Sequence, residues 1–124
     1  MRLEKVQYFT ENEEAFSDLL IKIGTRRSVA KVLVFLAHTP EASSRAIERG
    51  TDLRQPEVSI AIRYLAEQHW ISARDSKGET KSRPVKIYEL SRPIEKIMDS
   101  IEKEKKKEAQ NQLAMVQKLR DYIT

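Results

Sequence analysis

Hydrophobic residues recur at helical spacing along the first forty residues of the chain. Between residues 12 and 23 they fall every three or four positions, as on one face of an α-helix. These apolar residues are Ala15, Phe16, Leu19, Leu20 and Ile23. A second helix is expected from Thr25 or Ser28 to His38. Apolar residues cover most of its circumference, so we expect it at the centre of the core.

The segment from Ser43 to Ile71 has the pattern of a helix, a tight turn and a second helix. The first helix is expected over residues 43–49, with Ser43 or Ser44 capping its exposed N–H groups. Gly50 is expected to end it, because glycine adopts a left-handed backbone without steric cost. Residues 51–54 form the turn. Pro56 then suits the first helical position, where a missing N–H group leaves no bond unmade.

The second helix of this pair has one apolar face and one polar face. The apolar positions predict its buried side, and they are Val58, Ala61, Ile62, Leu65 and Ala66. The opposite face carries Glu57, Ser59, Arg63 and Glu67. A DNA-binding helix-turn-helix places such a second helix in the major groove. A plain helical bundle whose helices are joined by a tight turn would give the same pattern. The segment that follows distinguishes this bundle from a DNA-binding helix-turn-helix.

Two strand-like segments follow, with a polar loop between them. Residues 70–74 change to a β-compatible pattern, and residues 85–90 alternate apolar and polar without a break. The loop over residues 75–84 contains glycine and proline. A hairpin directly after a helix-turn-helix predicts a wing. Its basic residues are candidates for contacts with DNA phosphates or the adjacent minor groove, and they are Lys77, Lys81, Arg83 and Lys86.

The chain from residue 94 to residue 123 contains neither glycine nor proline and predicts one long helix. At about 1.5 Å per residue it would be roughly 45 Å long, too long to pack fully on a small domain. We therefore expect a second copy to cover its far end in a homodimer. Alternatively, the helix folds back on its own domain, or the charged run over residues 102–108 has a nucleic-acid role. The expected dimer contacts are Ile97, Ile101, Ala109, Leu113, Val116 and Ile123.

These elements predict a mainly α protein with a small β-hairpin wing. We expect a winged helix-turn-helix DNA-binding domain over residues 1–92 and a long C-terminal dimerisation helix over residues 93–124. The net charge of the 124 residues is only +4, so the chain is not a histone-like polycation. The excess is local, because residues 72–93 hold six basic and three acidic residues. A basic patch beside a groove-reading helix suits DNA phosphates.

The sequence offers no set of residues for catalysis or for a cofactor. It has no cysteine, which excludes disulfides, cysteine-ligated zinc and thiol chemistry. No glycine-rich phosphate loop, nucleophile motif or metal-ligand spacing is present, so we expect no enzymatic activity and no cofactor. The first ten residues lack the apolar core of a signal peptide, and no apolar run approaches the roughly 20 residues that span a bilayer. The expectation is a soluble, cytoplasmic protein.

The sequence resembles winged-helix transcriptional regulators of the broad MarR, ArsR and TrmB groups, and small archaeal members most of all. The resemblance covers roughly residues 14–92. It is carried by the serine-rich start of the first motif helix, the turn, the core of the second helix, and both wing strands; these are residues 42–44, 50–53, 58–65, 70–71 and 83–88. His69 stands where the usual glycine precedes the wing strand. Metal sensing is not supported, because His38 and His69 are the only histidines and cysteine is absent.

The helix-turn-helix geometry assigns a role to each candidate. Base contacts are expected from Gln55, Glu57, Ser59 and Arg63, because glutamine pairs with adenine, arginine with guanine, and glutamate accepts from cytosine. Ile60 either touches a thymine methyl group or packs against the wing or the first helix. Backbone contacts are expected from Ser43, Ser44, Arg45 and Arg54.

The predicted function is a homodimeric, sequence-specific regulator that binds double-stranded DNA. The alternative is a winged-helix adaptor or subunit of the transcription machinery. The sequence identifies no small-molecule effector.

Overall fold

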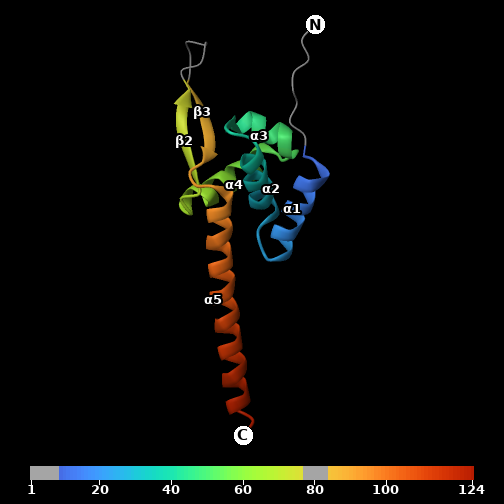
Figure 1. Ribbon diagram of the computed structural model, residues 1–124, viewed down its shortest axis with the longest axis vertical. Helices are drawn as coiled ribbons and strands as arrows, with labels where there is room; N and C mark the ends of the chain where they lie inside the picture. The colour runs from blue at the N-terminus through green and yellow to red at the C-terminus, as the bar shows by residue number, and fades with distance from the viewer. Residues whose placement is uncertain (1–8, 77–83) are drawn as a thin grey trace. The chain divides into compact units, whose positions relative to one another are not determined.

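The computed structural model describes residues 9–76 and 84–124, which form five helices and three strands (Figure 1). In chain order these are α1 (Glu11–Lys22), α2 (Arg27–His38), β1 (Ala42–Ser43), α3 (Ser44–Thr51), α4 (Gln55–Glu67), β2 (Ile71–Ser76), β3 (Val85–Leu90) and α5 (Ile94–Asp121). The chain divides into two compact units, Met1–Arg92 and Pro93–Thr124. The first unit holds the sheet and four of these helices, and the second consists of α5 and the residues that follow it.

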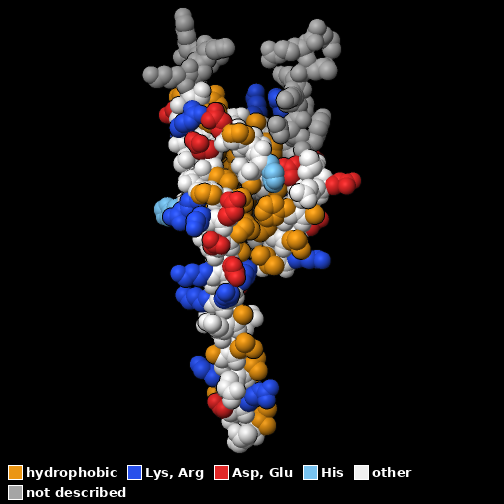
Figure 2. Space-filling view, in the orientation of Figure 1, with side chains coloured by type: hydrophobic (Ala, Val, Ile, Leu, Met, Phe, Trp, Pro, Cys, Tyr) orange, Lys and Arg blue, Asp and Glu red, His pale blue; other side chains and the backbone are white. Residues whose placement is uncertain are grey.

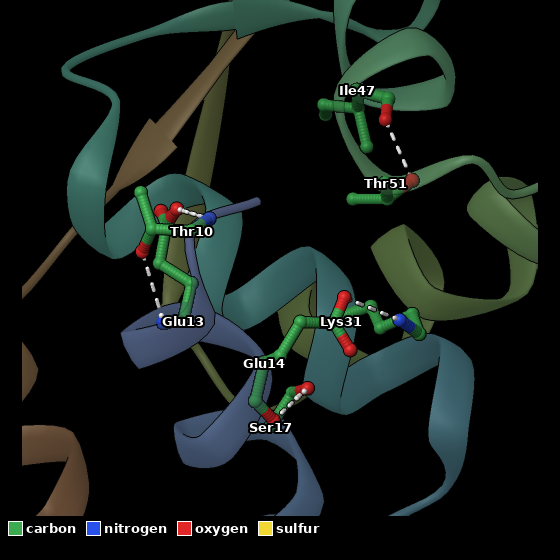
Figure 3. A network of polar contacts seen from close by, with 7 residues as sticks. All are labelled: Thr10, Glu13, Glu14, Ser17, Lys31, Ile47 and Thr51. Carbon is green, nitrogen blue, oxygen red and sulfur yellow. Dashed lines mark hydrogen bonds and ion pairs between the residues drawn. The ribbon is translucent and has the colours of Figure 1, made fainter. Parts of the chain in front are cut away.

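Helix α2 forms the centre of the first unit. All residues from Ser28 to Leu36 are buried, and α2 contacts α1, α3, α4 and β3. This confirms the central position that its apolar circumference predicts. One buried residue of α2 is charged: the Lys31 ammonium lies 3.4 Å from the Glu14 carboxylate (Figure 3). It also lies 5.1 Å from the centre of the Phe9 ring. An ion pair and a ring face compensate an ammonium group for the loss of water.

Helix α1 lies where the hydrophobic pattern places it, but that pattern does not identify its buried side. The buried residues are Glu13, Ser17 and Leu20, whereas Leu19 is 62% exposed and Ile23 is also exposed. Local hydrogen bonds explain how polar side chains occupy the buried side. The Glu13 carboxylate accepts from the Thr10 backbone N–H (2.7 Å), and the Ser17 hydroxyl donates to the Glu14 carbonyl (3.1 Å; Figure 3). Because the Glu13 and Ser17 side chains form these hydrogen bonds, their burial costs little free energy.

The three strands form one antiparallel sheet in the order β1-β3-β2. In the hairpin, Ile71 pairs with Leu90 and Ser76 with Val85, which confirms both predicted wing strands. The sequence did not predict β1, whose Ala42 pairs with Tyr88. Two residues are too short to show an alternation, so β1 leaves no local signal.

Helix α3 begins as predicted but does not end at Gly50. The Ser43 hydroxyl accepts from the Ala46 N–H (3.2 Å) and caps the helix, which continues through Thr51. The left-handed residue is Asp52, with φ of 58°. Gly50 serves packing instead, because a Cβ atom there would lie 2.0 Å from the Phe35 ring of α2. The expectation that Gly50 terminates the helix is therefore wrong.

Helix α5 is one continuous helix of 28 residues, about 42 Å long at about 1.5 Å per residue. It begins after Pro93, which serves as its N-cap residue. Every side chain from Lys106 to Thr124 is exposed, including the apolar ones. No helix in the described parts of the chain is long and apolar enough to cross a membrane.

The close approach of α3 to α2 predicts whether Gly50→Ala raises or lowers the free energy of unfolding. Replacing an interior helix glycine by alanine normally stabilises a protein, by roughly 0.5–1 kcal/mol. Gly50→Ala should instead lower the free energy of unfolding by about 1–3 kcal/mol, because the new methyl group meets the buried Phe35 ring. Urea unfolding followed by circular dichroism measures the difference. The double variant Gly50→Ala/Phe35→Leu should lose less stability than the two single variants lose together. A stabilising Gly50→Ala would refute the packing role.

Candidate nucleic-acid interface

The turn between α3 and α4 is short and firmly held. Asp52 takes the left-handed conformation, and the next residue, Leu53, inserts its side chain into the core. The Thr51 hydroxyl donates to the Ile47 carbonyl (2.6 Å), which satisfies a buried hydroxyl at the end of α3 (Figure 3). The polar residues of this turn therefore fix the direction in which α4 leaves it.

Helix α4 starts one residue earlier than the sequence predicts, so Pro56 is its second residue. The Glu57 carboxylate accepts from the backbone N–H of Arg54 (3.0 Å) and caps the start of the helix. This is one half of a capping box, because the Arg54 side chain has no acceptor for the N–H groups at the start of the helix. The structure thus gives Glu57 a capping contact that the sequence analysis did not foresee, although an acidic residue three positions after the N-cap is a recognisable signal.

The two faces of α4 differ as the sequence predicts, with one exception. Val58, Ala61 and Leu65 are buried and Ile62 is half-buried, whereas Ala66 is exposed and does not belong to the buried face. The exposed face includes the predicted base-contacting residues Gln55, Ser59 and Arg63, together with Ile60. The Gln55 amide donates to the Ser59 hydroxyl (3.1 Å), so these two side chains lie together one helical turn apart.

The predicted backbone-contacting residues lie near the start of α3 and α4. Ser43 uses its hydroxyl to cap α3, and Ser44 is half-buried. Arg45 and Arg54 are exposed. Neither they nor Arg63 form an ion pair with any carboxylate in residues 9–76 and 84–124. Arg49 of α3 is likewise exposed and makes no ion pair within the described residues, so four guanidinium groups on or next to these two helices are available to an anionic ligand.

The described basic side chains of the wing are paired with acids. The Arg74 guanidinium hydrogen-bonds the Glu41 carboxylate, and its Nε lies 3.8 Å from Glu89. The hydrogen bond with Glu41 raises the pKa of Arg74 above its usual value. Lys86 lies 3.5 Å from Asp75, its register partner in the hairpin. The other predicted wing cations, Lys77, Lys81 and Arg83, lie outside the described residues.

The junction between α4 and the wing has the geometry that a glycine would give. His69 has φ of 63°, in the left-handed region that favours glycine. Its carbonyl accepts from the Ser91 hydroxyl (2.7 Å), and the Trp70 carbonyl accepts from the Ser91 N–H (2.8 Å). The buried Trp70 also meets Tyr64 edge to face, at 6.4 Å between ring centres. His69 therefore takes, at this junction, the left-handed backbone conformation that a glycine adopts without steric cost.

Metal ligation has no support in the described residues, where no group of three or more histidine, cysteine or acidic side chains could hold an ion. His38 instead makes structural contacts at the end of α2. Its Nδ1 lies 2.9 Å from the Val34 carbonyl oxygen and 3.4 Å from the Glu13 carboxylate, and its ring packs edge to face on Phe16.

Comparison with known proteins identifies the fold. No protein-family model matches the sequence, and no curated protein matches it significantly. Among solved structures, the transcriptional regulator SlyA superposes with a TM-score of 0.50 at 17% identity, over 90% of this chain and 80% of that one. AbfR in its disulfide form superposes with a TM-score of 0.51 at 16% identity, over 77% of this chain and 64% of that one.

A third similar structure is Pex from Synechococcus, with a TM-score of 0.46 at 24% identity, over 53% of this chain and 64% of that one. The chain thus spans about 64% of the length of both Pex and AbfR. The superpositions on SlyA and AbfR, with the helix-turn-helix and hairpin described above, establish a winged-helix fold. The resemblance to archaeal members in particular stays a prediction.

The contacts of Arg74 predict how the sheet responds to a substitution. Arg74 lies on β2, yet its guanidinium reaches across β3 to Glu41, the residue before β1. Arg74→Gln should therefore speed amide hydrogen exchange in residues 41–44 and leave α2 protected, because loss of the pair frees β1 first. Lys86→Gln, which breaks the pair inside the hairpin, is the matched control. Equal exchange in residues 41–44 of both variants would show that Arg74 does not hold β1.

Proposed function

We propose that the protein is a sequence-specific DNA-binding transcription regulator that acts as a homodimer. The observation that carries the proposal is the exposed face of α4 in a winged-helix fold. That face presents Arg63 without an ion pair among the described residues, beside the hydrogen-bonded pair Gln55 and Ser59. In helix-turn-helix proteins the second helix of the motif enters the major groove, where such side chains read base edges.

The proposal assigns a particular base contact to several exposed side chains of α4. Arg63 can donate two hydrogen bonds to guanine, and Gln55 can pair bidentately with adenine. The Ser59 hydroxyl orients Gln55 before DNA arrives, which lowers the entropy lost on binding. Ile60, 42% exposed, is the residue proposed to touch a thymine methyl group. Glu57 is the weakest candidate, because its carboxylate caps the helix.

Contacts with the DNA backbone are assigned to residues beside α4. At the starts of α3 and α4 these are Ser43, Ser44, Arg45 and Arg54, and in the wing they are Lys77, Lys81, Arg83 and Lys86. Such contacts position the protein on the duplex and carry no sequence information. Lys86 would have to exchange its contact with Asp75 for a phosphate.

Homodimerisation is proposed to occur through α5. The exposed apolar side chains of its C-terminal half include Val116 (45% exposed) and Ile123 (83% exposed). Figure 2 shows hydrophobic side chains following one side of this half of the helix. Of the predicted contacts, Ala109, Leu113, Val116 and Ile123 are exposed and Ile101 is half-buried, so these are the proposed contacts. Ile97 is already fully buried in the single chain and is not proposed as a contact. Pairing of two such helices would remove this apolar surface from water. A two-fold dimer would also present two copies of α4 to a palindromic site.

One observation favours a second candidate, a winged-helix adaptor that binds another protein. The described cations of the wing are paired with carboxylates of the same sheet, which reduces their attraction for phosphates. An adaptor would bind DNA weakly and without dependence on Arg63. The same titration therefore separates the two candidates.

The DNA-binding proposal is tested by titration of fluorescent duplexes at several salt concentrations. We expect affinity for random duplex DNA to fall steeply with salt, because phosphate contacts release counterions. On a sequence selected from a random pool, Arg63→Ala should cost about 1–3 kcal/mol of discrimination against other sequences. Arg45→Ala, which removes the same charge from α3, should weaken all sequences alike. Absence of salt-dependent binding would refute the regulator and favour the adaptor.

The dimer is tested with two substitutions that add the same charge to the same part of α5. Val116→Glu places a carboxylate in the apolar side of the helix and should weaken self-association at least tenfold, because a charge would be buried without a partner. Ala114→Glu lies on the opposite side and should leave the dimer intact. Sedimentation velocity over a range of concentrations measures both. If the two variants associate equally, α5 does not form the interface in this way.

A further inference from the structure

Four lysines lie on one face of α5, and we call them the lysine face: Lys96, Lys103, Lys107 and Lys118. At about 100° per residue, their directions around the helix axis fall within about 60° of one another. All four are exposed. None is within ion-pair distance of a carboxylate anywhere in the described chain, even though acidic residues make up much of the neighbouring sequence.

The other lysines in the middle of α5 are paired. Lys105 lies 3.2 Å from Glu108, and Lys106 lies 3.3 Å from Glu102. Figure 2 shows basic side chains gathered around this part of the helix. The helix therefore separates its lysines into two kinds, those neutralised by glutamates and those of the lysine face.

The lysine face lies opposite the apolar side of α5. By the same helical geometry, Ala109, Val116 and Ile123 point about 140–180° away from Lys96. A second copy that covered the apolar side would leave the lysine face in solvent, so dimerisation and binding of an anion at these lysines are compatible. The inference rests in this respect on the proposed function.

The spacing of the lysines suits a duplex. From Lys96 to Lys118 the helix rises about 33 Å, close to one turn of B-DNA. Duplex DNA carries one phosphate charge per about 1.7 Å of its axis, so a line of cations can meet phosphates without a fixed register. Lysine ammonium groups on flexible stems bind phosphates as point charges and do not distinguish bases. Three acidic residues, Asp99, Glu104 and Asp121, lie near the line. Lys103 and Lys107 are the central pair of the lysine face, one helical turn apart, so they are the pair to test.

We propose that the lysine face of α5 is a second DNA-binding surface, which contacts duplex phosphates without reading sequence. An anionic membrane is the less suitable occupant. A helix that lies in a bilayer surface inserts its apolar side and keeps its lysines at the edges of that side. In α5 the lysine face is turned directly away from the apolar side, so the same helix could not engage a membrane with both.

The test compares two variants of the full chain that remove the same charge from the same turns of α5. Lys103→Gln/Lys107→Gln removes half of the lysine face, and Lys105→Gln/Lys106→Gln removes two paired lysines. Affinity for random duplex DNA is measured between about 50 and 200 mM salt. Loss of two phosphate contacts should lower the slope of log K against log salt concentration by about 1.8 per protomer engaged. The paired-lysine variant should lower the slope by less than half as much.

The outcomes separate this inference from the proposed function. If the unaltered protein shows no salt-dependent DNA binding, the proposed function fails. If it binds but both variants keep its slope, or lose it equally, only the lysine face is refuted. Circular dichroism and sedimentation confirm that each variant keeps its helix and its association state. Binding to phosphatidylserine vesicles that is lost in Lys103→Gln/Lys107→Gln, while DNA binding is unchanged, would assign the face to a membrane and overturn the proposal.

Discussion

The approach of α3 to α2 at Gly50 is the constraint on which the rest of the first unit depends. A hydrogen atom in place of a side chain lets α3 lie directly against the Phe35 ring, within a helix that is buried from Ser28 to Leu36. Strand β1 runs straight into α3 at Ser43, so the position of α3 also fixes the edge to which β3 and then β2 are added. The same helix leads through Asp52 and Leu53 into α4. One close packing contact thus sets both the wing and the proposed recognition helix.

The cations of the described residues fall into two groups, those paired with carboxylates and those without such a partner. Arg74 and Lys86 are held by carboxylates and stabilise the sheet, while Arg45, Arg54 and Arg63 have no such partner among the described residues. Net charge alone does not show this division, because +4 over 124 residues is modest. A paired cation must give up its carboxylate before it binds a phosphate. The unpaired cations therefore determine the attraction for a polyanion. They include cations of α3, α4 and one face of α5, together with others such as Arg27 of α2 and Arg92.

Local periodicity predicted most elements, and long-range contacts account for what it missed. The α2 core, both wing strands and the buried residues Val58, Ala61 and Leu65 follow from patterns within a dozen residues. The buried side of α1 does not, because it depends on hydrogen bonds that let Glu13 and Ser17 be buried in place of Leu19. The role of Gly50 depends on Phe35, and the contact of Arg74 depends on Glu41, 33 positions away. Of the proposed site, the sequence identified the exposed face of α4 but not the capping contact of Glu57.

The roles proposed for α4 and α5 differ because the chemistry of their exposed faces differs. A row of unpaired lysines attracts any duplex, and such attraction lets a protein move along DNA while it samples sequence. The base contacts proposed for α4 would need close and oriented approach, so they would act only once the protein is already on the duplex. A dimer would carry two lysine faces and two copies of α4, and once one copy is bound the second finds DNA at a high local concentration. The 3.6-residue period of the helix is what allows this arrangement, because it keeps the apolar side of α5 and its lysine face on opposite sides along the whole length.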